Sequence, residues 1–282
     1  MKSYLSLVPI SAKVRKRQNR MTILCVIISI FLVTAIFSVA DMMIRTQSDR
    51  MTGKNGSWHI ELDGISQETA LKIAGRDDVV SIGAVTIFNP DGELPYRMDG
   101  KRVVLYGIDE SYLTMNSTGA AEGRFPQGMG EIMLSSNAAR VLQVAVGDTV
   151  TLRTPSGDWD FTVSGLGGVE ESYYSGQYSL MDAYLPRTAF AALMEQNNVH
   201  NLQTSYYVQF TSASKAAKAI PELTAQHNLP ENAVSENTGV MAIAGQSDSS
   251  AAKNVYSLAA VLFVLVLLAG VLMISGSMNS NL

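Results

Sequence analysis

Residues 21–40 read MTILCVIISIFLVTAIFSVA, twenty positions without a charge, a proline or a glycine. At about 1.5 Å per helical residue, such a run is about 30 Å long, which matches the hydrocarbon core of a bilayer. A second uncharged run, VYSLAAVLFVLVLLAGVLMI, covers residues 255–274. Because the backbone in lipid must satisfy its own hydrogen bonds, the two runs predict transmembrane helices at 21–40 and 255–275. One large loop, 41–254, separates them.

The charges divide sharply along the chain. Six basic residues and no acidic one precede the first run, whereas the loop holds the other 15 basic residues and all 25 acidic ones, a net charge of −10. Short cytoplasmic segments carry the excess of Lys and Arg, which predicts a cell-membrane protein with both termini inside and the loop outside. Residues 1–20 are either a solvated tail or an amphipathic helix on the anionic inner surface of the bilayer. The basic cluster expected there is Lys13, Arg15, Lys16, Arg17 and Arg20.

A cleaved signal peptide is the alternative for this N-terminus. The triplet Ser38-Val39-Ala40 has small residues at the spacing that signal peptidase accepts, but the long basic segment and the long apolar run favour an anchored helix. The single cysteine, Cys25, lies inside the first run. The outer loop therefore forms no disulfide and must hold together by its own hydrophobic core.

The loop begins with a strand, helix, strand pattern. Alternation predicts a strand at 58–62, a Ser66-capped helix ending at Gly75 and a strand at 79–88. A similar unit appears near the far end, with strands at 204–210 and 233–236 around a helix at 214–227 that Pro221 is expected to interrupt or restart. We expect the two βαβ units to pair into one sheet near the membrane.

The middle of the loop, about residues 100–200, is expected to form a second, β-rich lobe farther out. A strand at 131–135 precedes a short helix at about 137–144, and 149–154 pairs with 159–166 as a hairpin. The predicted fold class is thus a membrane protein whose two transmembrane helices flank an α+β extracytoplasmic domain with two lobes.

The run GRFPQGMGEIMLSSNAARVLQVAVGDTVTLRTPSGDWDFTVSGL, residues 123–166, resembles the outer core domain of the MacB and FtsX-like family of ABC transporter permeases. In that family a Gly-Arg-x-Pro turn leads to Glu-Ile, a small helix, a Leu-x-Val-x-Val-Gly-Asp turn and a strand pair ending in Val-x-Gly. Glycine and aspartate suit turns, so we expect these residues to be structural and none to be catalytic. The matching motif residues are Gly123, Arg124, Pro126, Glu131, Ile132, Leu142, Val144, Val146, Gly147, Asp148, Val163 and Gly165.

The resemblance implies a permease subunit without its own cofactor. A separate cytoplasmic ATPase would bind ATP, and its closure would move the transmembrane helices and the outer domain for export, extraction or signalling. It also implies a second permease copy or half, and a peptide, lipoprotein or protein substrate. Family members continue past the second helix, so residues 276–282 are expected to be a truncated cytoplasmic stub.

The absent motifs limit the other function classes. The chain lacks the phosphate loop GxxxxGK[ST] and the patterns GxSxG, CxxC and HExxH, so we predict neither ATP hydrolysis nor another enzymatic activity. The three histidines, His59, His200 and His227, are far apart, and we predict no metal site. An acidic loop argues against nucleic acid. A two-span ligand sensor is the main alternative, and an anchored outer-face hydrolase is a weaker one.

One stretch of the loop suits partner contact. Residues 167–178 combine flexible glycines with acidic and tyrosine side chains, as contact surfaces often do; the alternative is a long hairpin loop packed on its own domain. The residues expected to make contact are Glu170, Glu171, Tyr173, Tyr174 and Tyr178.

Overall fold

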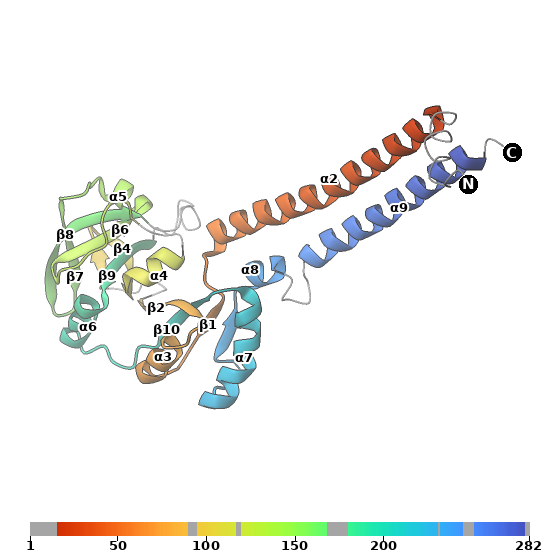
Figure 1. Ribbon diagram of the computed structural model, residues 1–282. Coiled ribbons are helices and arrows are strands. Elements are labelled where there is room, and N and C mark those ends of the chain that lie inside the picture. The colour runs from red at the N-terminus through yellow and green to blue at the C-terminus, as the bar shows by residue number, and fades with distance from the viewer. Residues whose placement is uncertain are drawn as a thin grey trace, which may run out of the picture. The chain divides into compact units, whose positions relative to one another are not determined.

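The computed structural model describes residues 16–89, 95–116, 120–167, 180–230, 232–244 and 251–279 (Figure 1). The chain divides into two units, which are described separately. A helical unit combines Met1–Ser48 with Asp248–Leu282, and an α/β unit comprises Asp49–Ser247.

Two long helices account for the described residues of the helical unit. Helix α2 spans Lys16–Asn55, and its last seven residues belong to the α/β unit; helix α9 spans Ala251–Asn279. Both are long and apolar enough to cross a membrane. Their outward side chains are apolar as well, with Phe31 and Leu272 each 70% exposed. Apolar surface of this extent is unfavourable in water and favourable in lipid.

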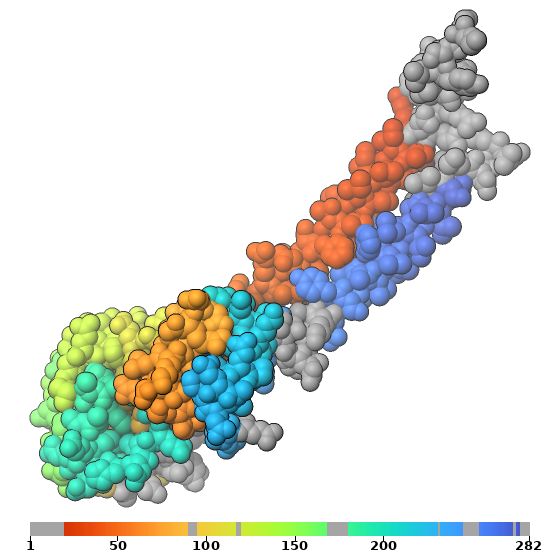
Figure 2. Space-filling model, turned by 60° about the horizontal axis from the view of Figure 1, so that its bottom comes forward, coloured from red at the N-terminus to blue at the C-terminus, as the bar shows by residue number. Residues whose placement is uncertain are grey.

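Small residues line the contact between α2 and α9, which lie side by side in Figures 1 and 2. The rings of Phe37 and Phe263 are 5.9 Å apart between centroids. Ala259 is buried, and a Cβ on Gly270 would lie 2.9 Å from the Ser29 hydroxyl. Close approach of the two backbones thus depends on small side chains, as is common between helices in membranes.

The C-terminal end of α2 lies farther along the chain than the first run suggested. Gly53 remains helical, and the helix stops at Asn55 because Gly56 adopts a left-handed conformation with φ +84°. A Cβ at Gly56 would lie 2.6 Å from the carbonyl oxygen of Met115, so only glycine fits this turn.

The strands of the α/β unit form one hydrogen-bonded network in the order β11-β1-β10-β2-β4-β3-β7-β8-β6-β9. Strand β5 pairs with β8, and β4 also pairs with β9. The described strands are β1 (Ile60–Leu62), β2 (Val79–Phe88), β3 (Arg97–Met98), β4 (Lys101–Ile108), β5 (Ala120–Gly123), β6 (Glu131–Ser135), β7 (Thr149–Thr154), β8 (Gly157–Gly167), β9 (Leu180–Pro186), β10 (Thr204–Phe210) and β11 (Val234–Glu236).

The expectation that the two βαβ units pair is confirmed. Strands β1 and β2 both run antiparallel to β10, which lies between them, and β11 pairs with the outer side of β1. This interlocked order is that of a split βαβ sheet. Helices α3 (Gln67–Ala74) and α7 (Ala213–His227) share one hydrophobic cluster with the inward residues of β1 and β10, and Figure 1 shows them on one face of the sheet.

Six strands close on themselves beyond this sheet. The pairings run β4-β3-β7-β8-β6-β9 and return from β9 to β4, with β4–β9 and β6–β8 parallel. The largest hydrophobic cluster fills the ring, with Leu105, Leu152 and Val163 fully buried. The expected β-rich character of the middle of the loop is thus present, whereas its separation as a second lobe stays a prediction.

The shorter helices begin and end at recognisable caps. Ser66 caps α3 by accepting a hydrogen bond from the Thr69 N–H at 3.1 Å, as expected. The expectation that Pro221 interrupts its helix is wrong, because α7 continues through it. Pro221 lies on the exposed face, where water can bond the carbonyl that it leaves free. The other helices are α4 (Glu110–Met115), α5 (Ser136–Leu142), α6 (Arg187–Gln196) and α8 (Thr238–Ile243).

Candidate functional site

The motif residues from Gly123 to Gly165 form two turns against β8 and part of the core of the closed ring. Arg124 binds Glu131 through both guanidinium nitrogens, with one Nη1–Oε2 distance of 2.9 Å. Glu131 also accepts hydrogen bonds from the backbone N–H groups of Gln127 and Gly128. The Arg124 hydrogen bond is the main cause that lowers the pKa of Glu131 to about 2.

Two motif glycines allow this turn to lie against β8. A Cβ on Gly165 would lie 2.4 Å from the carbonyl oxygen of Arg124, and one on Gly123 would lie 2.4 Å from that of Ser164. The Arg124 N–H donates to the Ser164 carbonyl at 2.9 Å. The Gly-Arg turn and the Val-x-Gly strand therefore form one contact.

The remaining motif residues make a second turn and part of the core. Gly147 has φ +98° and donates to the Val163 carbonyl, while the Asp148 carboxylate accepts from the Ala145 N–H at 2.8 Å. Ile132 and Val163 are fully buried in the ring, and Leu142 and Val144 pack against its core. Pro126 is buried and Val146 is half-buried.

Several residues named from the sequence fall elsewhere. Arg20 is an exposed residue of α2, and Lys16 and Arg17 belong to its first turn. Lys13, Arg15, Glu170, Glu171, Tyr173, Tyr174 and Tyr178 lie outside the described residues.

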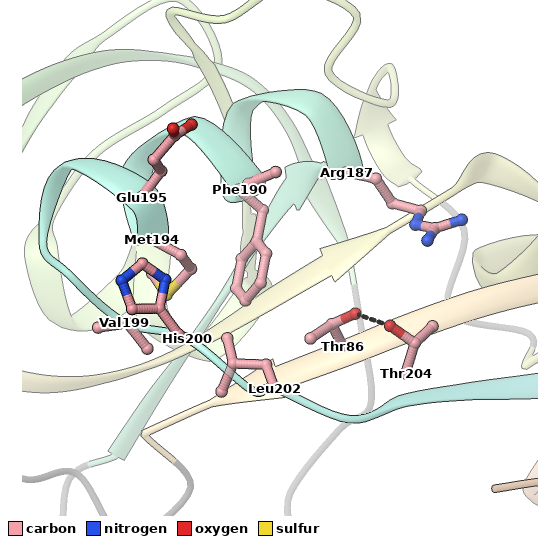
Figure 3. Close-up of a pocket in the computed structure, with 10 residues that line it drawn as sticks. Thr86, Arg187, Phe190, Met194, Glu195, Val199, His200, Leu202 and Thr204 are labelled. Carbon is pink, nitrogen blue, oxygen red and sulfur yellow. Dashed lines mark hydrogen bonds between the residues drawn. The ribbon is translucent and has the colours of Figure 1, made fainter. Parts of the chain in front are cut away.

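A pocket of about 400 Å³ lies beside helix α6, between that helix and the strands β2 and β10 (Figure 3). We call it the α6 pocket. Sequence reasoning missed it except for His200, because its other residues come from segments without a motif. It is lined by Thr86, Arg187, Phe190, Ala191, Met194, Glu195, Val199, His200, Leu202 and Thr204.

Two hydroxyl groups form the floor of the α6 pocket. Thr86 on β2 stands opposite Thr204 on β10, and their Oγ1 atoms are 2.7 Å apart. Thr86 is only 7% exposed. Thr204 is half-buried, so the pair, which we call the hydroxyl pair, is a part-buried polar group at the pocket.

The apolar wall comes from α6 and the segment that follows it. Phe190 packs on Gly107, where a Cβ would lie 2.4 Å from the ring. Asn197 holds the end of the helix, since its side chain donates to the Leu193 carbonyl at 2.8 Å and accepts from the Ser156 N–H at 3.0 Å. The chain can then pass Val199 and Leu202 along the pocket before it enters β10.

The charged groups stand at opposite ends of the pocket. Figure 3 shows Arg187 at one end and His200 at the other, with the Glu195 carboxylate pointing away from the hydroxyl pair. Arg187 is half-buried, whereas Glu195 and His200 are exposed. In the described part of the chain no carboxylate forms an ion pair with Arg187.

A second polar group of residues lies on the sheet face opposite α3 and α7. Tyr207 donates a hydrogen bond of 2.8 Å to Glu61, and its ring meets Trp58 and Tyr112 edge-on at centroid distances of 4.9 and 5.0 Å. Burial raises the pKa of Glu61, and burial followed by the Glu61 charge raises the pKa of Tyr112 to about 12. The hydrogen bond from Tyr207 to Glu61 and the ring contacts thus make this face a connected network.

The point where the chain enters the α/β unit is tied to the segment by which it leaves. The buried Asn237 side chain donates to the Trp58 carbonyl at 2.9 Å and to the Asn55 carbonyl at 3.3 Å. Its oxygen caps α8 by accepting from the Val240 N–H at 3.4 Å. The Asn237 N–H also donates to the His59 carbonyl.

No group of three or more His, Cys, Asp or Glu side chains that could hold a metal occurs among the residues that the structure covers. His59 is buried in the sheet, where its Nδ1 accepts a hydrogen bond from the Phe210 N–H, and burial lowers its pKa. His200 lies at the α6 pocket, and His227 is the last residue of α7.

In the sequence, the α/β unit is inserted between two apolar helices. Residues 21–226 match the model of the MacB-like periplasmic core domain, and the chain belongs to this family. The resemblance of residues 123–166 to MacB and FtsX-like permeases is thereby confirmed. No sequence among the curated proteins matches the chain.

Solved structures provide two further likenesses. The periplasmic region of MacB from Actinobacillus actinomycetemcomitans is 14% identical, with a TM-score of 0.47 over 70% of this chain and 96% of that one. The extracellular domain of the noncanonic ABC-type transporter YknZ from Gram-positive bacteria is 16% identical, with a TM-score of 0.44 over 64% of this chain and 98% of that one.

Proposed function

We propose that the chain is a permease component of an ABC transporter, in which a separate cytoplasmic ATPase drives motion of the α/β unit outside the membrane. The observation that carries the proposal is the family match over residues 21–226, which includes the first apolar helix as well as the outer domain. The chain binds no cofactor of its own in this proposal, and it acts with a second permease copy or half. Its substrate would be a peptide, a lipoprotein or another protein.

The charge distribution supports an orientation with both ends of the chain in the cytoplasm. The basic residues 1–20 then lie at the inner surface, the helices 21–40 and 255–275 span the bilayer, and the acidic residues 41–254 lie outside. Single cysteines at Ser11 and at Asp160, in a Cys25→Ser background, test this in intact cells. A membrane-impermeant thiol reagent should label only the cysteine at position 160. Labelling of the cysteine at position 11 instead would show the opposite orientation and contradict the proposal.

The packing of α2 on α9 supports a joint movement of the two helices. Val39, Ala40 and Met43 line one apolar groove together with Val255 and Leu258, so the outer ends of the apolar runs lie at the same level. Cysteine pairs placed near Asp41 and Asn254 should therefore crosslink in intact membranes. If no pair in this region crosslinks, the two helices do not form a shared stalk.

The proposal is tested by co-expression with the ATPase encoded nearest to its gene. We expect the two proteins to co-purify in detergent and the ATPase rate to fall when residues 1–20 are deleted. A matched control replaces the five residues of the basic cluster by glutamine and keeps the chain length. Failure to associate with any phosphate-loop ATPase would overturn the permease proposal.

The second candidate is a two-span sensor, which the α6 pocket favours because a sensor needs a ligand site in its outer domain. A sensor would bind its ligand without an ATPase partner. Co-purification of an ATPase therefore separates the two candidates.

A further inference from the structure

We propose that the α6 pocket binds an apolar molecule with a single carboxylate. Arg187 and the hydroxyl pair hold the carboxylate, and the apolar body lies along Phe190, Met194 and Leu202. The proposal concerns a ligand of the α/β unit alone and goes beyond the permease function, because it stands whether or not an ATPase associates with the chain.

Arg187 supplies an open anion-binding group. It is the first residue of α6, and within the described ranges no hydrogen bond or ion pair engages its guanidinium. Burial raises the pKa of Asp109, and the Arg187 charge lowers it only in part. The Asp109 carboxylate already accepts hydrogen bonds from the backbone N–H groups of Ala84 and Tyr112 at 2.9 Å each. The guanidinium fork, which matches a carboxylate with two parallel hydrogen bonds, is therefore available to a ligand.

The charges around the pocket fit a monoanion better than a dianion. Among the described residues that line the α6 pocket, Arg187 is the only Lys or Arg, and Glu195 adds an acidic group at the opposite end. A phosphate monoester would bring about two negative charges to one cation and a nearby carboxylate. A carboxylate brings one charge, which Arg187 balances.

The hydroxyl pair offers a second hydrogen-bond donor. Two hydroxyl groups carry two hydrogens, and the contact of 2.7 Å between Thr86 and Thr204 uses one of them. Under the proposal, the other hydrogen bonds a ligand oxygen. Arg187 and the hydroxyl pair thus provide donors on the side of Phe190 away from His200, as Figure 3 shows.

The apolar wall and the volume limit the rest of the ligand. Phe190 and Met194 are fixed by the core, being 4% and 3% exposed, so the wall is preformed. A volume of about 400 Å³ lies at the lower end of the range for small-molecule sites. It accommodates a few residues at the C-terminus of an apolar peptide or a short acyl chain, which share the same chemistry.

The test uses the full chain in lipid nanodiscs, with empty nanodiscs to correct for partition into lipid. The probes are N-acetyl-Leu-Phe with a free carboxylate, its C-terminal amide, octanoate and octanamide. Dissociation constants come from ligand-observed NMR titration. We expect saturable binding of at least one acid. Its amide should bind at least about tenfold more weakly, because a hydrogen bond to a charged group contributes about 1.5–3 kcal/mol.

Two variants and one control locate the binding. Arg187→Gln should weaken binding of the acid about tenfold and leave its amide unchanged. Ala191→Trp, a bulky change at an exposed position of the wall, should abolish binding of both. Arg153→Gln, which removes an exposed arginine of the β7–β8 hairpin, is the matched control and should change neither.

Binding of the peptide acid identifies a peptide C-terminus as the source, and binding of octanoate identifies an acyl chain; either supports the proposal. It is overturned if no acid binds saturably, if acid and amide bind alike, or if folded Arg187→Gln binds the acid as the wild type does. Because no ATPase is present, these results do not depend on the permease proposal.

Discussion

Replacing Asn237 by alanine should destabilise the α/β unit by about 2–4 kcal/mol. The side chain is 3% exposed, and its loss leaves the Val240 N–H without its cap, which costs about 1 kcal/mol. The Trp58 and Asn55 carbonyls also lose their amide donor, and an unmet hydrogen bond at a buried group costs about 1–3 kcal/mol. The sum is a large share of the stability of a typical domain.

Two further substitutions test the cause of the loss. Asn237→Ser keeps an oxygen for the cap and should lose less than alanine. Asn237→Asp keeps the cap but turns a carboxylate oxygen toward the carbonyls of Trp58 and Asn55, so at neutral pH it should be less stable than serine. The aspartate variant should recover part of this difference at acidic pH, when its carboxyl group can donate a hydrogen bond.

Urea unfolding of the full chain in detergent measures these differences. The protein contains two tryptophans, and Trp58 lies at the Asn237 contact, so a Trp159→Phe background makes fluorescence report on this place. An Asn237→Ala variant within about 0.5 kcal/mol of the wild type, the usual range of surface substitutions, would refute the reasoning. So would an aspartate variant more stable than the serine one at neutral pH.

Three other predictions concern the core and the motif. Burial lowers the folded pKa of His59 below its ordinary 6.5, so the stability that His59 contributes should be complete above pH 6.5 and decline below it. His59→Gln should remove this pH dependence from the free energy of unfolding, measured in urea between pH 7.5 and 5, and an unchanged pH slope would contradict the prediction. The pKa of Glu131 is lowered from 4.5 to about 2, so its contribution to the free energy of unfolding is present above pH 4.5 and lost between pH 4.5 and 2. Glu131→Gln should flatten the dependence of stability on pH in that window, whereas Glu195→Gln, at an exposed position, should not. Gly165→Ala should lower the free energy of unfolding by about 1–3 kcal/mol, because the new Cβ would lie 2.4 Å from the Arg124 carbonyl oxygen. Gly130→Ala, whose Cβ meets nothing within 4 Å, should not lower the melting temperature, and equal melting temperatures of the two variants would refute the steric argument.

Local patterns predicted the elements of the split βαβ sheet well. Strand 79–88 and the helix that follows Ser66 have the expected ends because alternation and capping depend on neighbouring residues alone. The pairing of the two βαβ units could also be predicted from the sequence, because the apolar face of each unit must be buried against another element. The Pro221 prediction failed because a proline rule for helix interiors ignores the exposed face on which the ring lies.

The closed ring could not be derived in the same way. Its closure depends on the parallel pairing of β4 with β9, two segments more than seventy residues apart in the chain, and on a strand of only two residues at Arg97–Met98. Neither the β4–β9 pairing nor the two-residue strand produces a recognisable pattern in the local sequence. The α6 pocket was missed for a related reason. Thr86 reads as an ordinary strand residue until the fold brings it beside α6, the helix that carries Arg187 and Phe190.

The position of Asn237 bears on how force would reach the α/β unit under the proposed function. The chain enters this unit at the end of α2 and approaches its exit through α8, and Asn237 binds both segments. Because Asn237 directly follows β11, a pull on either segment is shared with the other where both join the sheet. Separation of the two would first break the Asn237 hydrogen bonds, whereas movement of both together leaves them intact. The arrangement thus favours a joint displacement of the two segments, which moves the α/β unit as a body, over a displacement that stretches it.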